Sequence, residues 1–167
     1  MRIVIDSIVL DNLLSDIVYN NSKMNLDFSI YLELLYLSGC RANDALQFNR
    51  WQLLANSSVL LTPQKGNNLR SFGASELPIL FYNSLVDNEN IFEYLSYPKV
   101  LYYLDELLNK YDFRIIKKRC TNHLFRHNYA KLLKNDGFTD IEIKDKLGEK
   151  NLSSAMQYIN SSITYCQ

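Results

Sequence analysis

The chain has 167 residues, 47% of them hydrophobic and 22% charged, and its 18 basic and 18 acidic side chains give a formal net charge of zero. This composition excludes intrinsic disorder and a collagen-like chain, and it is typical of one globular domain with a sizeable core. No apolar run approaches the roughly 18 to 20 residues that span a bilayer, so the sequence predicts neither a membrane protein nor a secreted precursor.

Three helices are predicted in the first part of the chain. Apolar side chains recur at helical spacing over residues 7–20 and again over residues 27–39, where Asp27 suits an N-cap and Gly39 a C-terminal stop. The second of these helices is apolar nearly all round, so we expect it to be buried. A short helix over residues 42–48 follows.

Two short apolar runs, at residues 59–62 and 69–72, then flank the polar interval PQKGNN. A tight polar interval between two such runs predicts a β-hairpin. Residues 51–54 could supply a preceding strand, which would give a small antiparallel sheet of three. Helical periodicity resumes beyond Pro78 in five segments, at residues 79–83, 96–110, 121–135, 139–147 and from 152 onward.

The predicted fold class is therefore mainly α with a small antiparallel β-sheet (α+β). The chain contains no internal repeat and no Gly/Ser-rich linker. We therefore expect residues 1–167 to form a single domain.

The three cysteines, Cys40, Cys120 and Cys166, include no CxxC pair. Neither a disulfide framework nor a structural zinc site is predicted, and a reducing, cytoplasmic setting fits best. The two histidines, His123 and His127, lie four residues apart on one helix face, but the sequence HLFRH lacks the glutamate of the HExxH zinc helix. We therefore predict no metal.

Basic residues are concentrated in one stretch, residues 110–134, which contains a single acidic residue, Asp112. The basic residues there are Lys110, Arg114, Lys117, Lys118, Arg119, Arg126, Lys131 and Lys134. This distribution indicates either a strongly positive binding face or a solvated helix surface.

His123 and Arg126 are three residues apart, so both side chains can reach a common point from adjacent turns of one helix. A guanidinium fork binds the oxygens of a phosphodiester, and an imidazole can transfer a proton. Taken alone, the pair is better explained as part of a helix-surface salt bridge.

Four spaced segments change this interpretation: YLSGCRANDAL at residues 36–46, TPQKGN at 62–67, HLFRH at 123–127 and LGEKNLSSAMQYI at 147–159. Their order and spacing resemble the catalytic domain of the tyrosine recombinases, the phage-integrase family. The resemblance covers about residues 27–158 and implies the fold of that catalytic domain. Each segment alone is common, whereas four in the family's order are specific.

The resemblance assigns catalytic roles to scattered side chains. The matching residues are Arg41, Lys65, His123, Arg126 and Tyr158, with Asp44 and His127 in supporting positions. Twelve tyrosines are present, and Tyr158 is selected because the family's nucleophile lies ten positions beyond the glycine that is Gly148 here. Tyr165 is the nearest alternative.

A sixth position departs from the family. Glu149 stands where the family usually has His or Trp, and a carboxylate there would repel the phosphate. Three arrangements could relieve this: Glu149 pairs with a base such as Lys146, it turns away so that Lys150 approaches, or the nearby DNA keeps it protonated.

The implied function is that of a site-specific DNA recombinase or integrase, which cuts and rejoins DNA through a 3′-phosphotyrosyl intermediate. Tyr158 would attack the phosphodiester, Arg41 and Arg126 would bind the phosphate, His123 would assist proton transfer, and Lys65 would protonate the leaving oxygen. The resemblance implies no cofactor.

The implied partner is double-stranded DNA of a chromosome, virus, plasmid or mobile genetic element, bound by a dimer or tetramer. The residues expected to contact DNA are Lys117, Lys118, Arg119 and Lys131. Only about forty residues precede Arg41, so we expect no N-terminal core-binding domain.

Three other interpretations stay open. Glu149 favours a catalytically weakened recombinase-fold module that binds DNA without cutting it. A type IB topoisomerase would use the same chemistry for a different task. A helical interaction domain would not bind DNA at all.

Overall fold

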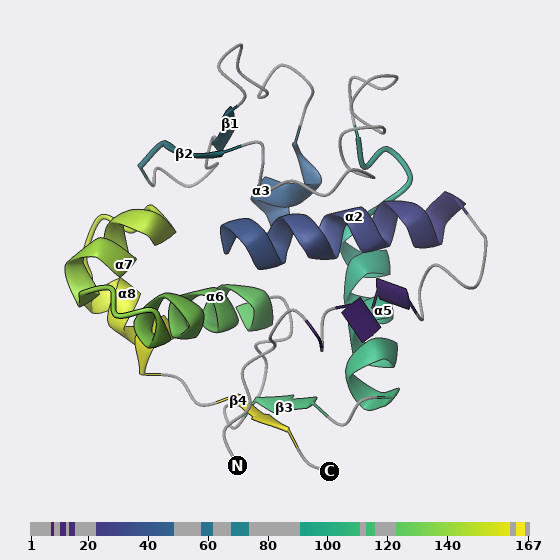
Figure 1. Cartoon of the computed structure of the whole chain (residues 1–167). Helices are drawn as coiled ribbons and strands as arrows, with labels where there is room; N and C mark the ends of the chain where they lie inside the picture. Colours follow the sequence, from purple (N-terminus) through teal and green to yellow (C-terminus); the bar gives the residue numbers. More distant parts are fainter. Residues whose placement is uncertain are drawn as a thin grey trace.

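Figure 1 shows the computed structural model of the chain. The structure describes residues 8, 11–12, 14–15, 23–48, 58–61, 68–73, 91–110, 113–115, 123–160 and 163–165. Its helices are α2 (Lys23–Ser38), α3 (Ala42–Leu46), α5 (Tyr97–Lys110), α6 (Leu124–Asn135), α7 (Asp140–Leu147) and α8 (Leu152–Ile159). Its strands are β1 (Ser58–Leu61), β2 (Arg70–Gly73), β3 (Phe113–Ile115) and β4 (Ile163–Tyr165). Within these residues, no helix combines the length and apolarity that a bilayer crossing requires.

The buried helix expected near residues 27–39 is α2, which lies at the centre of the molecule (Figure 1). Ile30, Leu32, Leu34 and Leu35 are almost completely buried, and each such side chain contributes roughly 1.5 to 3 kcal/mol by leaving water. The expected N-cap at Asp27 is wrong. The helix begins at Lys23, and Asp27 is buried within it rather than at its end, because good helix formers precede Asp27.

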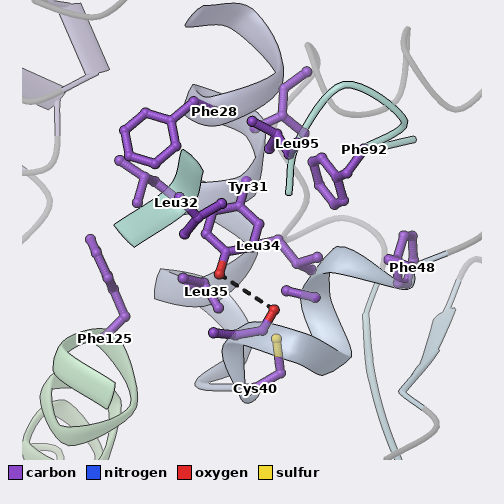
Figure 2. Packing of buried hydrophobic residues seen from close by; sticks show 14 of the residues in the cluster. Phe28, Tyr31, Leu32, Leu34, Leu35, Cys40, Phe48, Phe92, Leu95 and Phe125 are labelled. Carbon is purple, nitrogen blue, oxygen red and sulfur yellow. Dashed lines mark hydrogen bonds between the residues drawn. The ribbon is translucent and has the colours of Figure 1, made fainter. Parts of the chain in front are cut away.

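The first core gathers around α2 (Figure 2). Phe28, Tyr31 and Phe92 pack as neighbouring rings, with Tyr31 and Phe92 edge to face at 5.7 Å. The Tyr31 hydroxyl donates to the Ala42 carbonyl across 3.4 Å, as the dashed line shows. This contact links α2 to the segment that starts α3. Phe125 of α6 points into the same core.

Helix α6 carries a second core on its other side. Ala130 and Leu133 pack with Ile143 and Leu147 of α7 and with Ile159 of α8. Helix α6 therefore lies between α2 and the α7–α8 pair (Figure 1). The start of α6 is thereby fixed close to the ends of two other helices, and this arrangement creates the candidate site.

The two runs that flank the polar interval form β1 and β2, which pair antiparallel with Ser58 opposite Gly73 and Leu61 opposite Arg70. A second antiparallel pair joins β3 and β4, with Phe113 opposite Tyr165. This pair was not predicted, because three-residue strands carry too little periodicity and their partners are far apart in sequence. The strand expected at 51–54 and the helix expected at 79–83 lie outside the described residues.

Gly39 ends α2 with a left-handed backbone, φ +56°, and faces the ring of Tyr129 so closely that an added Cβ would overlap it. Gly39→Ala should lower the free energy of unfolding by about 2 to 3 kcal/mol, since it adds backbone strain and overpacking. Urea unfolding measures this loss. Gly137→Ala is the matched control: Gly137 has φ +88° but open space around it. Equal losses in the two variants would show that the Tyr129 contact contributes nothing.

Candidate active site

Arg41 is placed by the end of α2 and the start of α3. The Gly39 amide donates to the Leu35 carbonyl at 2.8 Å, and the left-handed turn at Gly39 redirects the chain. Arg41 then occupies the N-cap of α3, and its carbonyl accepts the Ala45 amide at 3.0 Å. Asp44 lies in the first turn of α3, where a carboxylate interacts favourably with the positive end of the helix dipole. The Arg41 side chain is thus presented beside the C-terminal end of α2.

Arg126 lies in the first turns of α6, and its side chain is only 2% exposed. It donates from Nη1 to the Gly39 carbonyl at 2.6 Å and from Nη2 to the Leu147 carbonyl at 2.7 Å. Both carbonyls lie at the C-terminal ends of helices, α2 and α7, where a cation is favoured. Arg126 therefore joins three helices through its guanidinium group.

Glu149 brings the two arginines together. Its Oε1 accepts from Arg41 Nη2 at 3.0 Å and from Arg126 Nη2 at 2.7 Å. The two guanidinium groups, which come from segments 85 positions apart, therefore meet at one oxygen atom. Glu149 is 4% exposed, whereas Arg41 retains 24% side-chain exposure and opens the cluster to solvent.

The turn after α7 directs Glu149 inward. Gly148 has φ +70°, and the Glu149 amide donates to the Lys144 carbonyl at 3.0 Å, which closes the helix end in the manner typical of a glycine stop. The Asn68 amide donates to the Gly148 carbonyl at 3.1 Å, so the segment just before β2 is tied to the same turn.

Of the expected arrangements for Glu149, pairing with basic side chains is confirmed, but the bases are Arg41 and Arg126 and not the example given, Lys146. The arrangement in which Glu149 turns away is wrong, because the carboxylate points inward while Lys150 is exposed. The inward position follows from the left-handed Gly148 and from the need of the buried Arg126 for a counter-charge.

Tyr158, near the end of α8, lies beside the arginine pair. Its ring centroid is 5.0 Å from Arg126 Cζ, which places the cation over the ring face. The Tyr158 hydroxyl lies 3.5 Å from Nδ1 of His123, the residue at the N-cap of α6. The His127 ring packs 4.9 Å from the Tyr158 ring.

The surroundings of both histidines lower their pKa values and so favour the neutral form. Burial lowers the pKa of His123, the charges of Arg126 and Arg41 lower it further, and Glu149 acts in the opposite direction. Burial, followed by repulsion from His123, lowers the pKa of His127 to about 4. A neutral imidazole can accept a proton, so His123 is suited to receive one from Tyr158.

No family model matches the chain. Tyrosine recombinase XerC of Rickettsia massiliae (strain Mtu5) is 30% identical over 161 residues, which cover 89% of this chain and 52% of the relative. XerC of Rickettsia canadensis (strain McKiel) is 28% identical, with 88% and 52% covered. The chain is related in sequence to the tyrosine recombinase family. It spans about half the length of the curated relatives it matches.

Solved structures agree with this family at the level of the fold. The catalytic domain of bacteriophage HP1 integrase superposes with a TM-score of 0.68 at 17% identity, over 95% of this chain and 87% of that one. XerH site-specific recombinase bound to difH substrate superposes with the same TM-score at 17% identity, over 92% of this chain and 49% of that one. The fold is that of a tyrosine recombinase catalytic domain.

Not every residue that the recombinase resemblance selected can be located. Lys65, Lys117, Lys118 and Arg119 lie outside the described residues. Lys131 lies on α6, one turn beyond His127, and is half-buried. Within the described part of the chain, no group of three or more His, Cys, Asp or Glu side chains is placed to hold a metal ion.

Sequence reasoning missed two groups of this candidate site, the Gly39 and Leu147 carbonyls that hold Arg126. No sequence signal identifies a backbone acceptor. It also named Lys146, and not the two arginines, as the example of a base that Glu149 would pair with, although a guanidinium buried in a helical core needs a counter-charge.

The lowered histidine pKa values predict a pH dependence of the stability of this domain. The unfolded His127 takes up a proton near its ordinary pKa of 6.5, whereas the folded one does so only near 4. The contribution of the neutral His127 to the free energy of unfolding is therefore fully present above pH 6.5. It is lost as the pH falls from 6.5 to 4, by about 1 to 2 kcal/mol after allowance for solvent screening. Urea unfolding from pH 7.5 to 4.5 measures this loss. His127→Gln should flatten the curve in that window, and an unchanged slope would contradict the assignment.

Proposed function

We propose that this chain is the catalytic domain of a site-specific DNA recombinase or integrase, which cuts and rejoins double-stranded DNA through a 3′-phosphotyrosyl intermediate. The observation that carries the proposal is the convergence of Arg41 and Arg126 on one anionic group beside Tyr158. Paired guanidinium groups suit the non-bridging oxygens of a phosphodiester. The DNA-bound XerH structure supports the choice of DNA as the substrate.

In the proposed reaction, the Tyr158 hydroxyl oxygen attacks phosphorus. The new bond joins phosphorus to the tyrosine oxygen, and the bond from phosphorus to the 5′ oxygen of DNA breaks. The phenol proton passes to His123, whose Nδ1 lies 3.5 Å from the hydroxyl. Because phenol has a pKa near 10, only about one molecule in a thousand is ionised at pH 7, so this transfer matters for the rate.

The remaining basic side chains stabilise or neutralise the negative charge that develops during the reaction. Arg41 and Arg126 stabilise the negative charge that builds on the phosphate oxygens in the transition state. Lys65 protonates the departing 5′ oxygen, a role assigned by its match to the family's hairpin lysine. Attack by a 5′ hydroxyl on the tyrosyl link reverses the step and rejoins the strand, with no nucleotide consumed.

The proposed oligomer is a dimer or larger assembly on DNA. A lambda integrase dimer bound to a core site has the same fold, with a TM-score of 0.69, and this likeness supports the proposal. Lys117, Lys118, Arg119 and Lys131 are proposed as DNA-contacting residues from their place in the basic stretch.

A second candidate function is a recombinase-fold module that binds DNA but cuts it slowly or not at all. The observation that favours it is the carboxylate of Glu149 on both arginines.

Nicked suicide DNA substrates separate the two functions. After cleavage such a substrate loses the short strand that would rejoin, so the covalent complex accumulates. We expect a DNA-linked band on a denaturing gel, with the link mapped to Tyr158. Tight, salt-sensitive DNA binding without any covalent species, on the substrate that binds best, would replace the recombinase with the binding module.

A further inference from the structure

Glu149 occupies the place where the two guanidinium groups converge. Both contacts end on the same oxygen, Oε1, at 3.0 Å from Arg41 and 2.7 Å from Arg126. A carboxylate oxygen accepting two guanidinium N–H groups has the charge and the hydrogen-bonding pattern of a phosphate oxygen. The site already contains an anion, and it belongs to the chain itself.

The burial of Arg126 explains why an internal anion is present. Its side chain is 2% exposed, its Nη1 donates to one carbonyl and its Nη2 to another carbonyl and to Glu149, and its Nε has no hydrogen-bond partner among the described residues. A buried guanidinium without a counter-charge would cost several kcal/mol. Before any DNA is bound, Glu149 supplies that counter-charge.

We infer that Glu149 is an intramolecular substitute for phosphate, which stabilises the DNA-free domain and closes its arginine pair to anions until the carboxylate moves away. The inference rests on the proposed function only in taking a DNA phosphate as the natural occupant. Binding of a phosphate is then an exchange of one anion for another. The stronger the Glu149 contacts, the lower the net affinity of the arginine pair for phosphate.

The turn at residues 148–150 provides a route for this exchange. The Glu149 backbone is held by the Lys144 carbonyl, and Gly148 is held by the Asn68 amide. The Glu149 side chain can therefore rotate while its backbone stays in place. Lys150, the next residue on the same turn, is exposed, so the turn lies at the surface.

The exchange makes opposite predictions for stability and for anion binding, which Glu149→Gln tests with inorganic phosphate as the probe. Unfolding midpoints are measured in sodium phosphate and in sodium chloride of equal ionic strength. In chloride, the variant should unfold at a lower temperature than the unaltered chain. Phosphate should stabilise the variant with an apparent dissociation constant at least tenfold lower than for the unaltered chain. Glu93→Gln, an exposed change of equal charge, should alter neither property.

Equal or tighter phosphate binding by the unaltered chain would overturn the inference. So would a phosphate gain that persists in Arg41→Gln/Glu149→Gln, because the added anion would then not lie on the arginine pair. If Glu149→Gln fails to fold, crystals of the unaltered chain soaked in phosphate provide the test. Phosphate on both arginines should displace the carboxylate, and phosphate beside an unmoved carboxylate, or none there at any concentration, would refute the exchange.

These measurements involve neither DNA nor covalent chemistry, so their failure is distinct from a failure of the recombinase proposal. An absent Tyr158 adduct leaves the phosphate result intact. A negative phosphate result likewise leaves open whether Tyr158 cuts DNA.

Discussion

Tyr158→Phe should abolish the covalent DNA adduct completely, because the variant lacks the oxygen that forms the bond to phosphorus. The ring remains, so its packing against His127 and its contact with the Arg126 cation should persist. DNA affinity and the unfolding midpoint should therefore change little. The adduct is measured on a denaturing gel with a nicked suicide substrate, and DNA binding is measured in parallel.

Tyr165→Phe is the matched control for this loss. Tyr165 lies in β4, only seven positions further along the chain, and is the nearest alternative nucleophile. Its variant should retain adduct formation. An adduct that survives Tyr158→Phe and disappears in Tyr165→Phe would identify Tyr165 of β4 as the nucleophile. It would also contradict the proposed proton transfer from Tyr158 to His123.

Arg126→Met should produce the largest combined loss of stability and activity. The change removes the donor to the Gly39 and Leu147 carbonyls. It also removes one of the two arginines that contact Glu149, so that Arg41 is the arginine that remains. Breaking a buried ion pair from one side costs about 3 to 5 kcal/mol. Loss of one preorganised donor to the transition state should also slow adduct formation by about 10² to 10³. Urea unfolding and single-turnover adduct kinetics measure the two effects.

A double-mutant cycle with Glu149→Gln tests the origin of the stability loss. If the unpaired carboxylate is responsible, Arg126→Met/Glu149→Gln should be less destabilised than the sum of the single changes, by about 1 kcal/mol or more. Additive losses would show that the two side chains contribute independently. The large cost of Arg126→Met would then come from its contacts with the backbone carbonyls.

Sequence patterns succeeded where the relevant information was local. The capping box of Thr139 and Glu142 begins α7 at the boundary expected from periodicity, and the glycine at 148 ends it. The polar interval around residue 65 separates two strands that do pair. In contrast, the β3–β4 pair joins short segments about fifty positions apart, and nothing within either segment specifies its partner.

Length, composition and helical periodicity determined that this chain is mainly helical. The resemblance of the four spaced segments to the tyrosine recombinases selected Arg41, Arg126, His123 and Tyr158 as candidate site residues. Only the tertiary structure decided what those side chains do in the absence of DNA. A periodic pattern reports which helix face is apolar, but it does not report which acceptors surround a buried guanidinium. Those acceptors come from the ends of α2 and α7 and from the turn at Glu149, which meet only when α6 packs between the two cores.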